Sequence, residues 1–257
     1  MHPDLLILCA TDHEMAPFLA QFPKDHSRTT RTGVRILEGQ IEKASYQLVL
    51  TGPGVFNTGH ALTVLLEKEK PVMILQTGIA GVFNGTGLGI GDVAVADQEQ
   101  YVHTGVGDAG VEKKPLPFDL VRGMSSTRQG GYEIDKSLSQ SCFECLVQEF
   151  SNGDVKVGKA NIITVSTITA TSGYANDIFK VCNPVMEAME GAAAAHIAAL
   201  YKIPFVEVRA ASNKVGQRDK SKWDIPQAAG RIPGICRAVS RVEVPLTHKA
   251  WLNDPIK

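Results

Sequence analysis

Long hydrophobic runs, a charge excess and paired metal-ligand motifs are all missing from this 257-residue chain. Every apolar run is shorter than the roughly 20 residues that span a bilayer, and the first is too short for a secretory leader. We therefore expect no membrane association and a cytoplasmic protein. The formal net charge of −1 gives no reason to expect attraction to nucleic acid. The expected partner is a small molecule.

Cysteine is scarce, and its five residues are an odd number. Cys142 and Cys145 form a C-x-x-C motif that is typical of redox or zinc half-sites, but no second motif supplies the remaining ligands of a tetrahedral site. The surrounding segment also has helical spacing, which by itself explains two small residues three apart. We expect reduced thiols, no metal and no cofactor.

Short apolar runs alternate with longer helical patterns along the chain, which predicts an α/β fold with a mostly parallel or mixed sheet covered by helices on both faces. The expected strands are Leu5–Ala10, Tyr46–Thr51, Val72–Thr77, Asp92–Ala96, Ala160–Ser166 and Phe205–Ala210, and the expected helices are Thr58–Lys68, Leu138–Phe150 and Ala188–Tyr201.

Residues 1–257 are expected to form a single domain. Residues 105–135 are rich in Gly, Pro, Ser and charge, which predicts a variable loop or partly disordered stretch inside the domain. After Ile225 we expect one short helix and an irregular tail. The glycines of residues 85–92 precede a strand rather than a helix, so they are expected to form turns and not a phosphate loop.

The first strand leads into Thr11, Asp12, His13 and Glu14. Two carboxylates and an imidazole at a strand exit suit acid–base chemistry. The same residues also suit a helix start, with Thr11 or Asp12 as the cap and Glu14 interacting with the helix dipole. The residues alone leave both interpretations open.

Three later segments place small or polar residues where a strand is expected to end. Small residues at positions 78–81 let a ligand approach the backbone closely. Glu190, at the start of an alanine-rich helix, has a carboxylate that can accept hydrogen bonds from two neighbouring hydroxyls. After Arg209, Ser212 and Asn213 are expected to open a polar loop, although a simple turn explains them equally well.

The four segments together resemble the nucleoside phosphorylase/nucleosidase superfamily, which includes methylthioadenosine/S-adenosylhomocysteine nucleosidase. The M-E-G-A run at Met189–Ala192 and the V-R-A-A-S-N run at Val208–Asn213 carry the resemblance, which extends from about Leu5 to about Ala229. It implies a barrel-like mixed sheet surrounded by helices, a purine nucleoside substrate and a homo-oligomer.

The resemblance also implies residue roles. It makes Glu14 the base that activates water, and Glu190 the carboxylate that holds the ribose hydroxyls. Asn213 stands where the adenine-specific nucleosidases have an aspartate, and it is expected to stabilise the departing base. The substrate-binding residues expected around the sugar and the reaction centre are Ile79, Ala80, Gly81, Met189 and Glu190.

An asparagine at position 213 favours a 6-oxopurine, because its NH₂ group can donate to both N7 and O6. This residue and the R-D-x-x-x-W run at Arg218–Trp223 are similar to the futalosine hydrolases of the superfamily, although that run is equally explained as a surface loop with an anchoring aromatic. The resemblance implies release of hypoxanthine from futalosine in menaquinone biosynthesis. Arg31, Arg35 and Arg218 are equal candidates for the substrate carboxylate.

Other activities stay open as alternatives. A methylthioadenosine/S-adenosylhomocysteine nucleosidase is disfavoured by Asn213. A purine nucleoside phosphorylase is disfavoured by Gln76, where the hexameric phosphorylases have a phosphate-binding Arg, and by Asp12 and Glu14, which are expected to repel phosphate. A nucleoside-binding protein without turnover is disfavoured by the presence of both Glu14 and Glu190.

Overall fold

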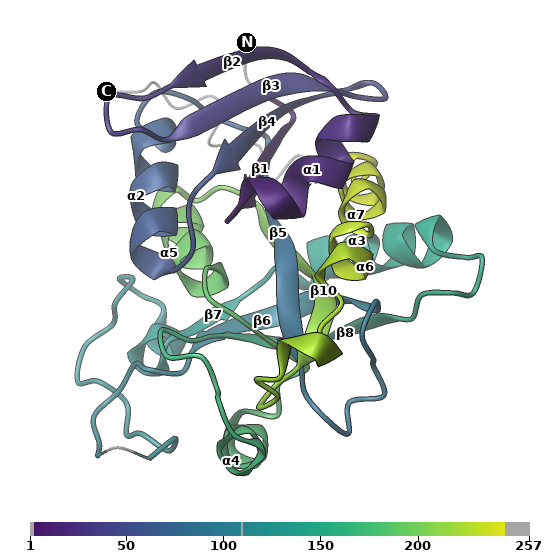
Figure 1. Cartoon of the computed structure of the whole chain (residues 1–257). Helices are drawn as coiled ribbons and strands as arrows, with labels where there is room; N and C mark the ends of the chain where they lie inside the picture. Colours follow the sequence, from purple (N-terminus) through teal and green to yellow (C-terminus); the bar gives the residue numbers. More distant parts are fainter. Residues whose placement is uncertain (1–2, 109, 245–257) are drawn as a thin grey trace.

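The computed structural model describes residues 3–108 and 110–244 of the chain, which alternate between strands and helices (Figure 1). The strands are β1 (Leu5–Cys9), β2 (Lys24–Thr29), β3 (Arg35–Ile41), β4 (Ala44–Leu50), β5 (Met73–Val82), β6 (Val93–Tyr101), β7 (Gly131–Glu133), β8 (Val157–Thr164), β9 (Met186–Ala188) and β10 (Phe205–Lys214). The helices are α1 (Asp12–Gln21), α2 (Val55–Leu66), η1 (Ser125–Gln129), α3 (Lys136–Glu149), α4 (Ser172–Cys182), α5 (Gly191–Tyr201), η2 (Lys220–Lys222), α6 (Ile225–Ala229) and α7 (Ile232–Ser240).

All ten strands belong to one mixed sheet, and part of it closes into a ring. The strand β10 pairs in parallel with β5 and antiparallel with β6, so the order β5–β9–β8–β6–β10 returns to β5. The strands β1, β4, β3 and β2 extend the sheet outward from β5. The result is the mixed, barrel-like sheet surrounded by helices that the family resemblance implies.

Helices cover the sheet on two sides. In Figure 1, α2 and α5 lie together on one side of β5, and α1, α3, α6 and α7 lie on the other. A separate apolar cluster is buried on each side, because strands covered on both faces need apolar side chains on both. The helix α4 covers a third, smaller cluster.

All six predicted strands and all three predicted helices are confirmed in type, but β2, β3, β7 and β9 were not predicted, and several predicted ends are wrong. We expected strands to end at Thr77 and Ala210, whereas β5 continues to Val82 and β10 to Lys214. The two strands pair with each other along this extension, past a bulge between Ala211 and Asn213, and Gly78 takes a φ of +142° that few other residues tolerate. Residues 79–81 and 212–213 therefore lie within strands, and the polar loop expected at Ser212 is wrong.

Three further expectations need correction. The helix predicted from Ala188 begins at Gly191, because Ala188 is still part of β9. The stretch 105–135 contains η1 and all of β7, so hydrogen bonding organises its later half. Residues after Ile225 form two helices, α6 and α7, instead of one, and the expected irregular tail lies mostly outside the described residues.

Two other expectations concern local features. The glycines at 85, 87 and 91 have φ values of 80–85° in the turns between β5 and β6, as predicted. Cys142 and Cys145 lie on α3, whose helical spacing was also predicted. No helix within residues 3–108 and 110–244 is both long enough and apolar enough to cross a membrane.

Helix α5 packs closely on the sheet because small residues form its buried face. The closest approach is at Gly191, where an added Cβ would lie 2.2 Å from Oε2 of Glu207 on β10. Glu207 is fully buried, and its carboxylate sits at the positive end of the helix dipole. A side chain at position 191 and this carboxylate therefore compete for the same space.

We expect Gly191→Ala to destabilise the fold by about 1–3 kcal/mol, the usual cost of overpacking a core, as measured by urea denaturation. Gly59→Ala is the matched control, because Gly59 lies inside α2 with no atom within 4 Å of its added Cβ. The control is expected to stabilise the protein by about 0.5–1 kcal/mol through helix propensity. Equal effects of the two substitutions would contradict this account.

Candidate active site

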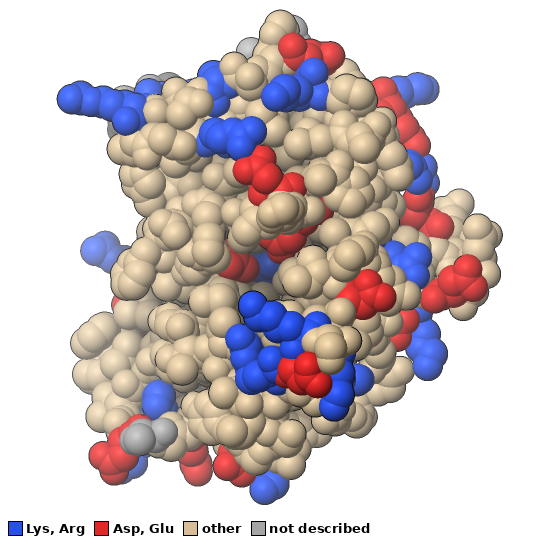
Figure 2. Space-filling model, in the orientation of Figure 1, with Lys and Arg blue, Asp and Glu red and all other residues tan. Residues whose placement is uncertain are grey.

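A cavity of about 380 Å³ opens where β1, β5, β9 and β10 meet their following segments. Figure 2 shows a hollow in the middle of this face of the molecule, with acidic side chains at its edge. All seven residues predicted for the site line this one cavity, which are Glu14, Ile79, Ala80, Gly81, Met189, Glu190 and Asn213. The structure thus brings together segments separated by up to about 200 positions in the chain, while the individual roles remain predictions.

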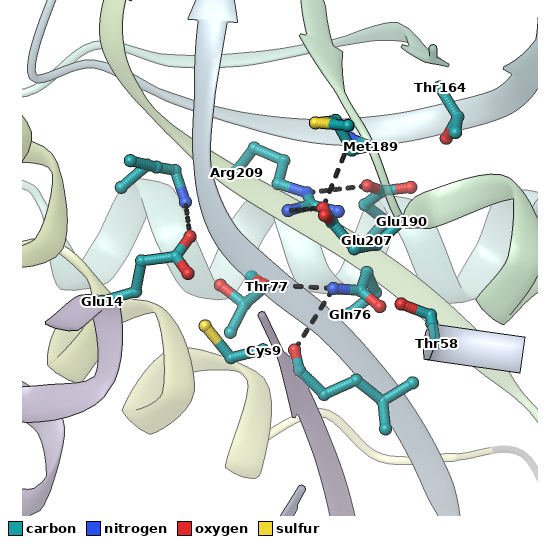
Figure 3. Close-up of polar contacts among 12 residues, drawn as sticks. Cys9, Glu14, Thr58, Gln76, Thr77, Thr164, Met189, Glu190, Glu207 and Arg209 are labelled. Carbon is teal, nitrogen blue, oxygen red and sulfur yellow. Dashed lines mark hydrogen bonds and ion pairs between the residues drawn. The ribbon is translucent and has the colours of Figure 1, made fainter. Parts of the chain in front are cut away.

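Glu14 is held in place by the start of α1. Thr11 caps the helix by accepting a hydrogen bond from the Glu14 N–H at 3.3 Å, and its hydroxyl donates to Glu14 Oε2 at 2.7 Å. The other oxygen, Oε1, accepts from the Ile79 N–H of β5 at 3.0 Å (Figure 3). The capping interpretation is therefore confirmed, and the Thr11 cap also orients the Glu14 carboxylate at the cavity.

Glu190 is fixed from three directions at the start of α5. Its Oε1 accepts the Gly54 N–H at 3.0 Å, and its Oε2 accepts the Met189 N–H at 3.3 Å. Oε2 also lies 3.2 Å from Nη1 of Arg209. These contacts orient the carboxylate at the cavity wall, where its remaining lone pairs can accept hydrogen bonds.

Arg209 is the fully buried cation beneath the cavity. Its Nε donates to Glu207 at 2.8 Å, and its Nη1 reaches Glu190 (Figure 3). Burial favours a lower pKa for this guanidinium, but the charges of Glu207 and Glu190 outweigh burial and raise its pKa. Neither Nη atom makes a well-aligned hydrogen bond to any described residue, and both are buried below the residues that line the cavity.

Gly78 provides the space in which these charged groups meet. A Cβ built at this residue would lie 2.8 Å from Glu14 Oε1 and 3.0 Å from Arg209 Nη1. The carboxylate and the guanidinium therefore lie against the same small stretch of β5. A carboxylate base and a fixed cation on either side of one point can orient a polar nucleophile.

A second buried acid, Glu99, lies behind Arg209. Burial first, and then the charge of Glu207, raise the pKa of Glu99 well above its ordinary value. The hydroxyl of Thr164 donates to its Oε1 at 2.6 Å. Burial beside a second carboxylate therefore favours the neutral form of Glu99, which adds no further negative charge around the one guanidinium.

Asn213 is positioned by its neighbours on β10. The Ser212 hydroxyl lies 2.8 Å from its Oδ1, and its Nδ2 donates to the Lys214 carbonyl at 3.1 Å. Ser212 is itself fixed by a hydrogen bond to the Ala80 carbonyl at 3.2 Å. The amide thus has a defined orientation, and one of its N–H groups remains for a ligand.

The sequence analysis missed Glu187 and Thr169, which also line the cavity, and did not identify Arg209 as a buried cation. The sequence did contain a signal for this buried pair. Glu207 and Arg209 are two positions apart in an otherwise apolar strand, so both side chains point to the same buried face, where each charge requires an opposite charge. Glu187 interrupts an apolar run in the same way.

Of the three arginines considered for a substrate carboxylate, only Arg218 lines the cavity. Its guanidinium stacks on the ring of Trp223, another lining residue, at 4.9 Å from the ring centroid. Arg35 is paired with Asp12 at 2.8 Å, and Arg31 is exposed elsewhere. Figure 2 shows basic side chains clustered at the rim of the hollow, over the segment between β10 and α6.

Two residues used to disfavour phosphate do not lie in the cavity. Gln76 is fully buried in β5, where its amide contacts the carbonyls of Leu8 and Thr77 (Figure 3). Asp12 points to Arg35, so its charge is compensated. Phosphate binding is instead disfavoured by the three carboxylates of the cavity wall, Glu14, Glu187 and Glu190.

Known proteins are similar to this chain over most of its length. Residues 4–241 match the family described as the Phosphorylase superfamily. A 5'-methylthioadenosine/S-adenosylhomocysteine nucleosidase of Oceanobacillus iheyensis is 31% identical over 88% of this chain and 93% of its own. A futalosine hydrolase of Acidothermus cellulolyticus is 30% identical over 82% and 78%. The structure of a Colwellia psychrerythraea nucleosidase in complex with adenine has a TM-score of 0.79 at 20% identity, covering 93% of this chain and 95% of that one.

The raised pKa of Glu99 leads to a prediction about stability and pH. Because the pKa of Glu99 is raised in the folded state, its contribution is complete below the unfolded pKa and is lost as pH rises toward the folded pKa. Glu99→Gln removes this titration. Between the two pKa values we expect wild type to lose stability relative to this variant by up to about 1.4 kcal/mol per pH unit.

Urea denaturation between pH 5 and pH 8 measures this difference. Glu144→Gln, at an exposed position of α3, is the control and should follow wild type at every pH. Parallel curves for Glu99→Gln and wild type would show that Glu99 is ionised in the folded protein.

Proposed function

This chain belongs to the Phosphorylase superfamily, as a nucleosidase, and we propose that its substrate is futalosine, which it hydrolyses to hypoxanthine and dehypoxanthinyl futalosine in menaquinone biosynthesis. One observation carries the proposal: Asn213, an amide that cannot deliver a proton, lines the same cavity as Glu14 and Glu190. The methylthioadenosine/S-adenosylhomocysteine nucleosidase activity named for several relatives is the alternative.

The charges of the cavity support water as the nucleophile. Its lining contains Glu14, Glu187 and Glu190 against a single exposed arginine, Arg218. Phosphate binding requires several cationic or N–H donors, and three carboxylates oppose it. Arg209 adds no accessible cation to this balance, because it is fully buried and paired with Glu207.

The mechanism follows from where the groups lie. Glu190 accepts hydrogen bonds from the ribose hydroxyls and fixes the sugar. As the C1′–N9 bond breaks, its electrons go to the base and the sugar gains oxocarbenium character. Glu14 takes a proton from the water whose oxygen attacks C1′. Asn213 donates a hydrogen bond to the departing base, which later receives its proton from solvent.

Arg218 and Trp223 support the extended substrate. A guanidinium stacked on an indole at the cavity wall offers both a carboxylate partner and an aromatic surface. The carboxyphenyl ketone at C5′ of futalosine presents both matching groups. The methylthio group of methylthioadenosine presents neither.

We also propose a cytoplasmic homo-oligomer, a dimer or larger. Phe56 at the start of α2 is 90% exposed, and nearby Pro53 lines the cavity. A large aromatic side chain in water beside a binding site is typical of a surface that another subunit covers. Sedimentation velocity measures the assembly state directly.

Glu14→Gln tests the proposed base. We expect kcat to fall by about 10²- to 10⁴-fold, the usual contribution of a general base, with a much smaller effect on KM. The matched control is Asp12→Asn, two residues earlier on the same helix but outside the cavity, which should retain near-normal turnover. Equal rates for both variants would remove Glu14 from the mechanism.

The proposed reaction is tested by measuring free base released from futalosine, inosine and methylthioadenosine, with and without phosphate. We expect hypoxanthine from futalosine at a rate that phosphate does not change. Adenine from methylthioadenosine as the main product would support the alternative nucleosidase, and dependence on phosphate would identify a phosphorylase. Absence of any product would favour a nucleoside-binding protein.

A further inference from the structure

Glu187 on β9 is a carboxylate of the cavity that the mechanism above does not use. It is 8% exposed and lines the cavity wall. Thr169 holds both of its oxygens: the Thr169 N–H donates to Oε1 at 3.1 Å, and the Thr169 hydroxyl donates to Oε2. A buried carboxylate costs free energy unless its hydrogen bonds are satisfied, and each oxygen retains a further lone pair.

Strand register places Glu187 and Asn213 on either side of one glycine. Gly81 of β5 pairs with Glu187 of β9 on one side and with Asn213 of β10 on the other. Residues in register on neighbouring strands point to the same face of a sheet. Two strand spacings separate the two residues by about 10 Å, and Gly81 between them has no side chain.

The space above Gly81 therefore suits a flat ring with a hydrogen-bonding group at each side. A Cβ at Gly81 would lie 3.3 Å from Asn213 Nδ2 and 3.0 Å from Val215 Cγ2, so a side chain here would fill the floor of the site. The two groups are chemically different: Asn213 can donate an N–H, and an ionised Glu187 can only accept.

We propose that Glu187 recognises the N1–H group of a 6-oxopurine, while Asn213 donates to N7 or O6 of the same ring. This inference rests on the proposed function and extends it to the choice of base. A 6-aminopurine has an unprotonated N1, whose lone pair would face the carboxylate without a proton between them. Leaving a buried acceptor unpaired in this way is strongly disfavoured.

Two hydrogen bonds orient Glu187 in the cavity wall. Burial raises the pKa of its carboxyl, and the hydrogen bonds from Thr169 and the charge of Arg218 offset only part of that rise. The two Thr169 donors also fix the plane of the carboxylate, because they engage both oxygens. The acceptor is thus oriented before a ligand arrives.

The test compares kcat/KM for futalosine with kcat/KM for its 6-amino analogue in Glu187→Gln. A glutamine amide can donate to an unprotonated N1, so we expect the preference for the 6-oxo substrate to fall by about 100-fold, the value of one hydrogen bond to a charged group. A structural role alone would lower both values together and leave their ratio unchanged. Glu144→Gln, on the exposed surface of α3, is the control and should keep the wild-type ratio.

A second measurement needs no variant. Futalosine methylated at N1 lacks the proton that Glu187 accepts, and we expect wild type to process it at least about 100-fold less efficiently than futalosine. Normal turnover of this compound, or an unchanged ratio in Glu187→Gln, would overturn the role of Glu187 but not the proposed function. A wild type that prefers the 6-amino substrate would overturn the proposed function, and this inference with it.

Discussion

The buried ion pairs of Arg209 with Glu207 and Glu190 are the interaction on which the rest of the site depends. An isolated charge inside a protein costs several kcal/mol, so the surrounding elements are constrained to compensate it. Gly191 has no side chain because Glu207 occupies that space, and the pKa of Glu99 is raised by burial and by the charge of Glu207. The same guanidinium orients Glu190 at the cavity wall.

The central parts of the fold could be predicted because buried strands are short, apolar and separated by helical patterns. Strand ends could not, since the extension of β5 and β10 depends on their pairing with each other and on the conformation of Gly78. Strand β2 has no apolar signal at all: its six residues, KDHSRT, are all exposed. Such an edge strand forms because β3 offers it hydrogen bonds, which no local pattern reveals.

The site was predicted in a similarly uneven way. Glu14, Glu190 and Asn213 lie in motifs that resemble a family, and the structure gathers them around one cavity. Glu187 lies outside those motifs, and its position beside Gly81 follows only from the pairing of β9 with β5. Gln76 shows the opposite case, because a position that is informative in the family pattern has a side chain buried away from the cavity.

Two residues of β5 that are two positions apart, Ile79 and Gly81, contact two different parts of the site. Ile79 is hydrogen-bonded to Glu14, and Gly81 lies between Glu187 and Asn213. A strand rises about 3.3 Å per residue, so the hydrolytic centre and the base floor keep a constant separation whatever residues flank the floor. The base-reading side chains belong to β9 and β10, whereas Glu14 belongs to α1. Substitution of Glu187 can therefore change which purine is accepted while Glu14 and Ile79 keep their positions, so base preference can evolve without moving the hydrolytic centre.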